Sequence, residues 1–369
     1  MDTDQSKQVN ASLGAPFVIE PRITSNSRLA LLMHDSLVGG WGKMGTGLLR
    51  YSEAEITAVV DRAHAGGNLR ALTGIDRDAP IVATVREAVA LGADTLVPGV
   101  ATPNGVLPPD WWPDVIDGLT LGLSLVNGLH APLAERADLT QLLHPGRYIW
   151  DVRKEPTSLQ NGLGRAQGLS AKRILTVGTD MAIGKMTASI ELDRAARKRG
   201  LRSKFLASGQ IGICIAGEGV ALDAVRVDFA TGAVEGMVLR NATDNDLLFI
   251  EGQGSALHPA STAWLALMRG GCPTHLILVH KARATSIARV PEVKIPKLTD
   301  VVRLYETISG AAGAMPAAKV VGIALNCQEL TDEEAAYEVE KTERETGLPT
   351  TDVVRFGVAS LLDAIIAYL

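Results

Sequence analysis

The chain has 369 residues, of which 46% are hydrophobic and 21% are charged, so it can bury a large core and is not a disordered protein. At roughly 150 residues per domain, this length predicts two domains. The formal net charge is −5, and basic residues form no run beyond isolated pairs such as Lys172-Arg173. Because binding to nucleic acid needs clustered cations, this distribution argues against a nucleic-acid partner.

Residues 1–25 predict a leader outside the folded domains, with a short extended piece at residues 17–19. The first residues are polar and lack the basic and apolar segments of a signal peptide. No apolar run approaches the roughly 20 residues that cross a bilayer, so we expect no membrane partner. Cys214, Cys272 and Cys327 lie far apart without metal-ligand or CxxC spacing, and we expect three small buried side chains. These features predict a cytoplasmic protein.

Between residues 26 and 160, apolar runs alternate with helical patterns. Such alternation predicts βαβ units and a mostly parallel sheet. The runs predicted as strands are 29–33, 81–85, 95–100, 123–127 and 148–152. The patterns predicted as helices are 53–65, 86–91, 111–122 and 131–143.

A polar, glycine-rich stretch at residues 154–171 predicts a linker, and a second α/β domain is expected at 161–369. Its predicted strands are 173–177, 204–207, 246–250, 275–280, 320–325 and 353–356. Its predicted helices are 184–199, 231–241, 262–269, 298–309, 332–345 and 359–368.

The strongest motif lies at residues 173–187, which read RILTVGTDMAIGKMT. An apolar strand runs into a glycine-bearing loop that ends in Gly-Lys, and a helix follows. Backbone N–H groups, the helix N-terminus and the lysine all attract phosphate in this arrangement. The residues predicted to hold a phosphate-bearing cofactor are Gly178, Thr179, Gly184, Lys185, Met186 and Thr187. A tight turn with an incidental lysine is the alternative.

The motif departs from the usual P-loop at two positions. Thr179 stands where the first glycine is expected, and Met186 replaces the hydroxyl residue that normally binds Mg²⁺. Thr187, one place later, is not placed for the same role. We therefore expect binding without a Mg²⁺ requirement and predict no metal site, although Asp180 or Glu251 could hold a metal instead.

The spelling GTD-x-x-x-GK-x-T resembles dethiobiotin synthetase and its relatives. Glu251 ends the apolar run 247–250, like the carboxylate of a Walker-B strand, and Asn326 ends the run 320–325. The resemblance implies that Asn326 holds the adenine of the cofactor. Acidic residues and Asn also occur at strand ends as simple caps.

Nearly the whole chain from about residue 28 resembles the D-glutamate N-acetyltransferase family. The segments that carry this resemblance are 43–52 (KMGTGLLRYS), 127–130 (NGLH), 150–153 (WDVR), 177–187 (VGTDMAIGKMT), 208–212 (SGQIG), 217–223 (GEGVALD), 251–259 (EGQGSALHP), 322–326 (GIALN) and 354–357 (VRFG). The resemblance implies a Rossmann-like N-terminal domain and a P-loop C-terminal domain. It also implies an enzyme that moves acetyl from acetyl-CoA to the amino group of an amino acid, with D-glutamate as the expected acceptor.

Acyl transfer needs a neutral amine, an oxyanion stabiliser and a positioned thioester. The candidates for catalysis are Glu251, His258 and Asp180, and backbone N–H groups of residues 252–255 could stabilise the oxyanion. A structural or metal-binding Glu251 and a solvated loop His258 remain alternatives.

A dicarboxylate acceptor needs cations, and arginine meets a carboxylate with two parallel hydrogen bonds. Arg50 and Arg283 are the candidates for substrate binding. For Arg50 the alternative is a loop that packs against the other domain. For Arg283, which follows His280 and Lys281, the alternative is a solvated basic surface.

Two other functions fit part of the pattern. The first is an ATP-dependent ligase or kinase of the dethiobiotin synthetase type, which would need ATP and Mg²⁺. The second is a nucleotide-dependent switch or scaffold. The expectation of two domains that could enclose a cleft argues against it. We also expect a homo-oligomer whose partner is a small amino-acid substrate.

Overall fold

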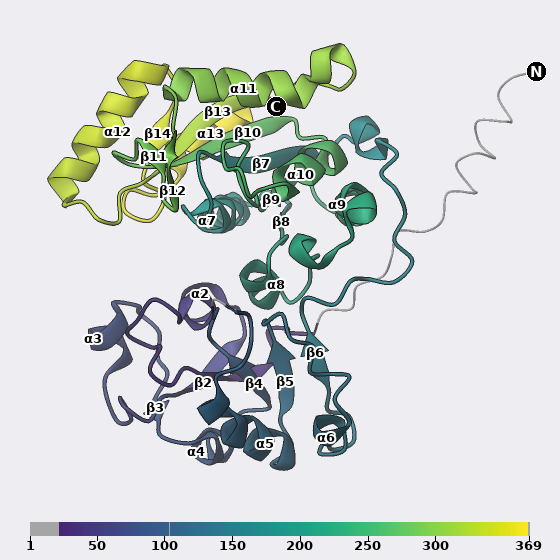
Figure 1. Cartoon of the computed structure of the whole chain (residues 1–369). Helices are drawn as coiled ribbons and strands as arrows, with labels where there is room; N and C mark the ends of the chain where they lie inside the picture. The colour runs from purple at the N-terminus through teal and green to yellow at the C-terminus, as the bar shows by residue number, and fades with distance from the viewer. Residues whose placement is uncertain (1–21, 103, 368–369) are drawn as a thin grey trace, which may run out of the picture.

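The computed structural model describes residues 22–102 and 104–367, so the extended piece predicted at residues 17–19 lies outside the described residues. Figure 1 shows two α/β halves, the N-terminal half below in purple and blue and the C-terminal half above in green and yellow. Each half is built on a six-stranded sheet whose strand pairs are all parallel. This confirms the predicted fold class of two parallel-sheet α/β domains.

The N-terminal sheet has the strand order β3-β2-β1-β4-β5-β6, which is the order of a Rossmann fold. Its strands are β1 (Arg28–Leu32), β2 (Glu55–Val60), β3 (Ile81–Val82), β4 (Thr95–Pro98), β5 (Ser124–Asn127) and β6 (Ile149–Asp151). The helices around it are α2 (Lys43–Tyr51), α3 (Leu69–Thr73), α4 (Val85–Ala90), α5 (Trp112–Thr120) and α6 (Ala137–Thr140). The strand order reverses between β1 and β4, where folds of this class bind ligands outside the carboxyl ends of the strands.

The helix predicted at residues 53–65 is wrong, because the chain forms β2 there and the helix α2 precedes it. β2 is buried at every position after Glu55, and a strand covered on both faces has no polar alternation to reveal it. The glycines of α2 concealed the helix. A Cβ on Gly47 would lie 2.7 Å from Cγ2 of Ile211, so a small residue is needed for close packing.

Two other predicted elements of this half are shorter in the structure. The helix predicted at residues 131–143 is reduced to α6, because the backbone N–H groups of Leu133 and Ala134 donate to the carboxylate of Asp151. The strand predicted at residues 81–85 ends at Val82. Thr84 then starts α4 with a capping box, in which its side chain and that of Glu87 exchange hydrogen bonds with the backbone.

The C-terminal sheet has the order β14-β13-β10-β7-β9-β8. Its strands are β7 (Lys172–Gly178), β8 (Ser203–Leu206), β9 (Leu247–Ile250), β10 (His275–Lys281), β13 (Lys319–Asn326) and β14 (Thr350–Thr351). A separate hairpin is formed by β11 (Ser286–Ile287) and β12 (Val290–Lys294). The helices are α7 (Lys185–Lys198), α8 (Gln210–Ala216), α9 (Val227–Asn241), α10 (Ala263–Gly271), α11 (Leu298–Gly310), α12 (Asp332–Thr346) and α13 (Ala359–Ala367).

The strand predicted at residues 353–356 is wrong. The strand is β14, and a turn follows it because Asp352 binds the backbone N–H groups of Val354 and Arg355 at 3.0 Å each. The segment that joins the two sheets is irregular apart from a short 3-10 turn at Arg165–Gly168. Its backbone is anchored by the buried carboxylate of Glu235, which accepts from the N–H of Arg165.

The two halves meet along helices that follow strands of each sheet. Helix α2, which follows β1, packs against α8, which follows β8. Met186, Ile211 and Ile215 of the C-terminal half pack against a hydrophobic cluster that both halves share. A guanidinium nitrogen of Arg194 also donates to the carbonyl oxygen of Tyr51 at 2.7 Å. Helices that follow β1, β7 and β8 therefore meet at one boundary.

Two sequence predictions concern the core and the surface. Cys214, Cys272 and Cys327 are free and buried, as predicted. Within residues 22–102 and 104–367, no helix combines the length and the apolar character needed to cross a membrane.

Candidate functional site

The loop between β7 and α7 has the geometry of a phosphate-binding loop. β7 ends at Gly178, α7 begins at Lys185, and the chain between them bends without regular structure. The φ angles of Ala182 and Gly184 are +55° and +112°, on either side of Ile183. Such alternation turns successive N–H groups toward one point, which suits an anion, and the α7 N-terminus adds to the same field.

Lys185 supplies a buried positive charge at this loop. Its side chain is 5% exposed, and its Nζ donates to the backbone oxygen of Asp180 at 2.7 Å. Burial lowers the pKa of Lys185 to about 8, although the charges of Asp180 and Glu251 oppose the shift. The negative charge of a phosphate at the loop would favour the charged form of Lys185.

Glu251 follows β9 and lies inside the same region. Its Oε2 accepts from the N–H groups of Ser208 (2.8 Å) and Gly209 (3.1 Å), and its Oε1 accepts from Nε2 of Gln253 at 3.2 Å. Burial raises the pKa of Glu251 to about 7 against these bonds and the charge of Lys185. A Cβ on Gly212 would overlap Oε2, which explains why the segment SGQIG needs a glycine there.

Asp180 and His258 form a pair beside the loop. Asp180 accepts from the N–H groups of Met181 (2.6 Å) and Ala288 (2.8 Å). Nε2 of His258 lies 3.9 Å from Oδ1 of Asp180. Because Nδ1 of His258 accepts from the N–H of Ala260 at 3.1 Å, the neutral imidazole carries its proton on Nε2. His258 is buried, not solvated, and is arranged to donate a hydrogen bond rather than to accept a proton.

Other predicted cofactor residues pack around the loop. The carbonyl of Gly178 accepts from the hydroxyl of Tyr305 at 2.7 Å. Thr179 Oγ1 lies 2.9 Å from Nδ1 of His280, whose pKa burial lowers to about 4, so this histidine is neutral at pH 7. Nδ2 of Asn326 donates to the carbonyl of Ile183 at 3.0 Å.

Met186 and Thr187 begin α7 beside these groups, and their surroundings differ from those of a Mg²⁺-binding P-loop. Met186 packs into the apolar cluster between the halves. Thr187 is half-buried in the first turn of the helix. The position that normally carries the metal-binding hydroxyl is therefore part of an apolar contact.

The two arginines predicted for the substrate differ in their surroundings. Arg283 is committed to α12, because its Nε pairs with Glu338 at 2.8 Å and its Nη1 pairs with Glu334 at 2.9 Å. Arg50 is exposed in the last turn of α2, in the other half. Among the residues that the structure describes, neither side chain forms a hydrogen bond or ion pair with the loop after β7.

A buried dyad in the N-terminal half was missed from the sequence. Asp61 is fully buried directly after β2, and its Oδ2 lies 2.7 Å from Nδ1 of His64. Oδ1 of Asp61 accepts from the N–H of Ala63 at 3.2 Å. His64 is partly exposed and presents Nε2 outward from this pair. The wrong helix prediction at residues 53–65 concealed the strand end that positions both side chains.

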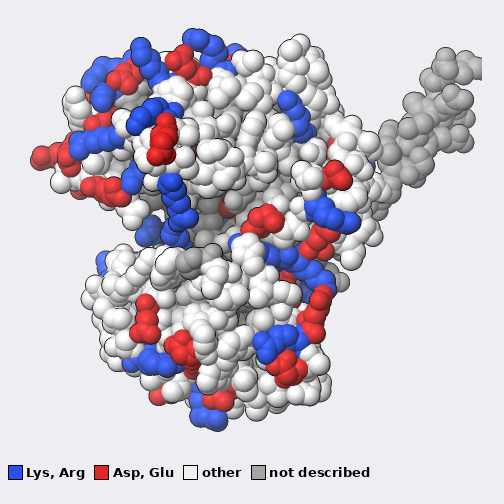
Figure 2. Space-filling view, in the orientation of Figure 1, with Lys and Arg blue, Asp and Glu red and all other residues white. Residues whose placement is uncertain are grey.

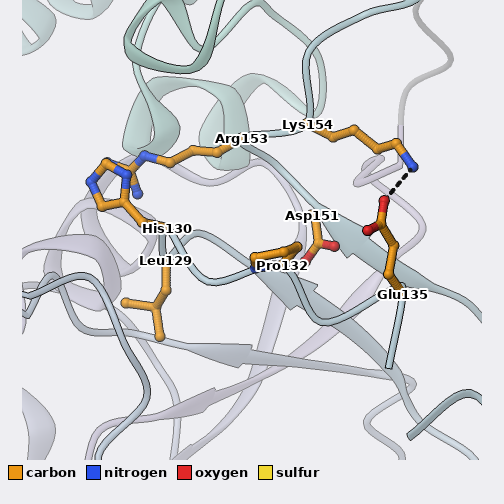
Figure 3. Close-up of a pocket in the computed structure, with 7 residues that line it drawn as sticks. All are labelled: Leu129, His130, Pro132, Glu135, Asp151, Arg153 and Lys154. Atoms are coloured by element: carbon orange, nitrogen blue, oxygen red, sulfur yellow. Dashed lines mark ion pairs between the residues drawn. The ribbon is translucent and has the colours of Figure 1, made fainter. Parts of the chain in front are cut away.

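A small pocket lies where β5 and β6 end, and Figure 3 shows its lining. Asp151 holds this corner together, because it accepts from Nδ2 of Asn127 at 2.7 Å and from two backbone N–H groups. Arg153 and His130 are both among the residues that line this pocket, as Figure 3 shows. Nε of Arg153 also pairs with Asp223 of the other half at 2.9 Å. The segments NGLH and WDVR therefore join β5 to β6 and one half to the other.

A Rossmann-ordered domain packed on a domain with a buried-lysine phosphate loop defines a two-domain P-loop protein. Residues 160–362 match a P-loop domain of unknown function (DUF1611_C), and residues 62–155 match its Rossmann-like partner (DUF1611_N). The chain belongs to this family. This membership confirms the resemblance to a family with a Rossmann-like and a P-loop domain.

Curated relatives and a solved structure agree with this assignment. The chain is 38% identical over 287 residues to a D-glutamate N-acetyltransferase of Tritonibacter scottomollicae, covering 77% of this chain and 84% of that protein. It is 34% identical over 281 residues to a D-glutamate N-acetyltransferase of a Pseudoalteromonas species, covering 76% and 83%. A crystal structure of a DUF1611 family protein from Anabaena variabilis is 54% identical, with a TM-score of 0.89, and covers 93% of this chain and 100% of its own.

Proposed function

We propose that this protein is an N-acetyltransferase that transfers acetyl from acetyl-CoA to the amino group of D-glutamate. The observation that carries the proposal is the 38% identity to a D-glutamate N-acetyltransferase over 77% of this chain. A match of this length is longer than either half, so it extends over both. The geometry of the loop after β7 is compatible with this activity.

The residues of the loop fit the phosphate end of acetyl-CoA. Lys185 is a buried cation whose Nζ donates to a backbone carbonyl rather than to a carboxylate, so it can bind a pyrophosphate. Met186 offers no hydroxyl for Mg²⁺, which suits a pyrophosphate that is held and not cleaved. When bound, acetyl-CoA supplies the acetyl thioester. Asn326, fixed against Ile183, is the residue we propose for the adenine.

The chain must also remove a proton from the ammonium of the acceptor. We assign this step to Glu251, because a carboxylate with a pKa near 7 is matched to proton transfer at neutral pH. The competing proton acceptor is His64, whose Nδ1 is held by Asp61. His64 lies in the other half, directly after β2. A mutation of His64 therefore leaves Glu251 in place, and the two assignments can be tested separately.

Donors for the oxyanion are restricted by the hydrogen bonds already made. The N–H groups of Gly252 and Ser255 donate to Thr176 and Ser261, so neither is available. We propose that Nε2–H of His258 contributes a donor, since its neutral tautomer points this proton toward the loop region. Asp180 then acts as a positioning residue for the hairpin β11–β12, whose Ala288 it binds.

Ligand-induced thermal shift tests the choice of cofactor. A ligand that binds only the folded state raises the melting temperature by mass action. We expect CoA and acetyl-CoA to stabilise the protein more than ATP with Mg²⁺ does. Stabilisation by ATP–Mg²⁺ with no effect of CoA would contradict the proposal and favour the ligase or kinase. The cytoplasmic location and the homo-oligomeric state stay predictions.

A further inference from the structure

The hairpin β11–β12 is fixed against the phosphate loop. Its turn residue Ala288 donates its N–H to Oδ2 of Asp180 at 2.8 Å. Ile287, just before the turn, is fully buried and anchors the hairpin in the core. At the base of the hairpin, the N–H of Ile295 donates to the carbonyl of Thr285 at 2.9 Å. The next residue after the anchored Ala288 is Arg289, and adjacent Cα atoms are only about 3.8 Å apart.

This hairpin and its flanks carry a concentration of positive charge. Residues 281–297 contain five basic residues and one acidic residue, in a chain whose net charge is −5. Lys281 pairs with Glu329, and Arg283 is committed to α12. Figure 2 shows basic side chains along the upper border of the hollow between the two halves, below the place where Figure 1 labels β12.

The remaining cations of the hairpin are available to a ligand. Arg289, Lys294 and Lys297 are exposed, and none of them forms an ion pair with any residue in the described part of the chain. Lys294 lies opposite Ser286 in the hairpin register. Because Ala288 is bound to Asp180, the adjacent Arg289 brings one of these cations next to the anion-binding loop, which favours a second anion at this position.

We infer that Arg289, with Lys294 in support, binds the 3′-phosphate of CoA while the loop after β7 holds the pyrophosphate. This inference rests on the proposed function. A phosphate monoester carries a charge between about −1.5 and −2 at pH 7, which a P-loop with a single lysine leaves unpaired. Arginine binds such a group with two parallel hydrogen bonds, and the anchored turn holds Arg289 beside the loop.

The test compares CoA with 3′-dephospho-CoA, which differ only by the group in question. Calorimetry on the full chain should show CoA binding about tenfold more tightly or better, the scale of one charge-assisted contact. Arg289→Ala should lower the affinity for CoA about tenfold and leave that for dephospho-CoA unchanged, and Lys294→Ala should do the same to a smaller extent. Lys185→Ala should weaken both ligands by the same factor. Arg86→Ala, an exposed arginine of α4 far from the hairpin, is the matched control and should change neither.

Each outcome bears on one part of the proposal. Equal affinities of the native protein for the two ligands would overturn the hairpin site and leave the acetyltransferase in place. The hairpin site is likewise overturned if Arg289→Ala weakens both ligands equally. If neither ligand binds while D-glutamate is not acetylated, the proposed function itself fails, and this site fails with it.

Discussion

The carboxylate of Glu251 and the ammonium of Lys185 are buried within electrostatic reach of each other, and burial moves their pKa values to about 7 and about 8. Desolvation favours the neutral form of each group, and the charge of each group partly restores the charged form of the other. Glu251 must lose its proton to act as a base, whereas Lys185 must keep its proton to bind phosphate.

The profile of kcat/KM against pH should therefore be bell-shaped. Activity should rise as Glu251 deprotonates near pH 7 and fall as Lys185 deprotonates near pH 8, so the maximum lies between these values. Glu251→Gln should abolish most activity and keep the fold, since the amide preserves the shape of the side chain. If His64→Gln instead abolishes the activity while Glu251→Gln retains it, the proton acceptor is His64.

Loss of the loop lysine should weaken cofactor binding. Lys185→Ala should cost about 1.5–3 kcal/mol of CoA binding, the scale of a charge-assisted hydrogen bond. Calorimetry at pH 7 measures this difference directly. Lys198→Ala, an exposed lysine at the other end of α7, is the control. Unchanged CoA affinity in Lys185→Ala would remove the loop from the cofactor site.

Turnover should not require Mg²⁺. Met186 stands where the metal-binding hydroxyl belongs, and its side chain packs into the apolar contact between the halves. The rate of thiol release should be the same with saturating chelator as without it. A loss of turnover that only Mg²⁺ restores would favour the ATP-dependent ligase or kinase.

Helix α8 lies so close to Glu251 that position 212 should accept no residue larger than glycine. Gly212→Ala should displace the carboxylate and destabilise the protein by about 1–3 kcal/mol, because overpacking a buried site forces neighbours to move. Denaturant unfolding gives this free energy. Gly168→Ala is the matched control, since a Cβ there has nothing within 4 Å. Equal stability of the two variants would show that Glu251 is not held as tightly as the structure indicates.

The parts of the site that the sequence could predict are local. The strand, loop and helix around Lys185 lie within one short segment, and Glu251 and Asn326 end buried apolar strands whose carboxyl ends share one edge of the sheet. Their meeting follows from parallel topology alone.

The rest depends on contacts between distant segments. Asp180 and Ala288 are 108 residues apart, so their hydrogen bond has no local signal. The pairing of Arg283 with α12 likewise depends on packing and could not be anticipated. Asp61 and His64 were hidden because a fully buried strand and a helix give the same apolar pattern over a few residues.

The acceptor site needs cations to bind the side-chain carboxylate of an acidic amino acid. A neutral amino acid would leave these cations unpaired. Arg50 is the first candidate, because Arg283 already pairs with two carboxylates. Arg50→Ala should raise KM for D-glutamate with little change in kcat, and Arg50→Lys should recover part of the loss. Steady-state kinetics at saturating acetyl-CoA gives both constants. An unaltered KM would exclude Arg50 from the substrate site.

The most direct test of the central claim is product identification with kcat/KM for D-glutamate, L-glutamate, D-glutamine and D-norvaline, using acetyl-CoA in the presence of chelator. We predict N-acetyl-D-glutamate as the product, with one thiol released per product. The preference for D-glutamate over D-norvaline should be several kcal/mol, roughly a hundredfold or more in kcat/KM, because a site built for a carboxylate rejects a substrate that lacks one. If no amino acid is acetylated, or if D-norvaline reacts as well as D-glutamate, the assignment as a D-glutamate N-acetyltransferase is contradicted.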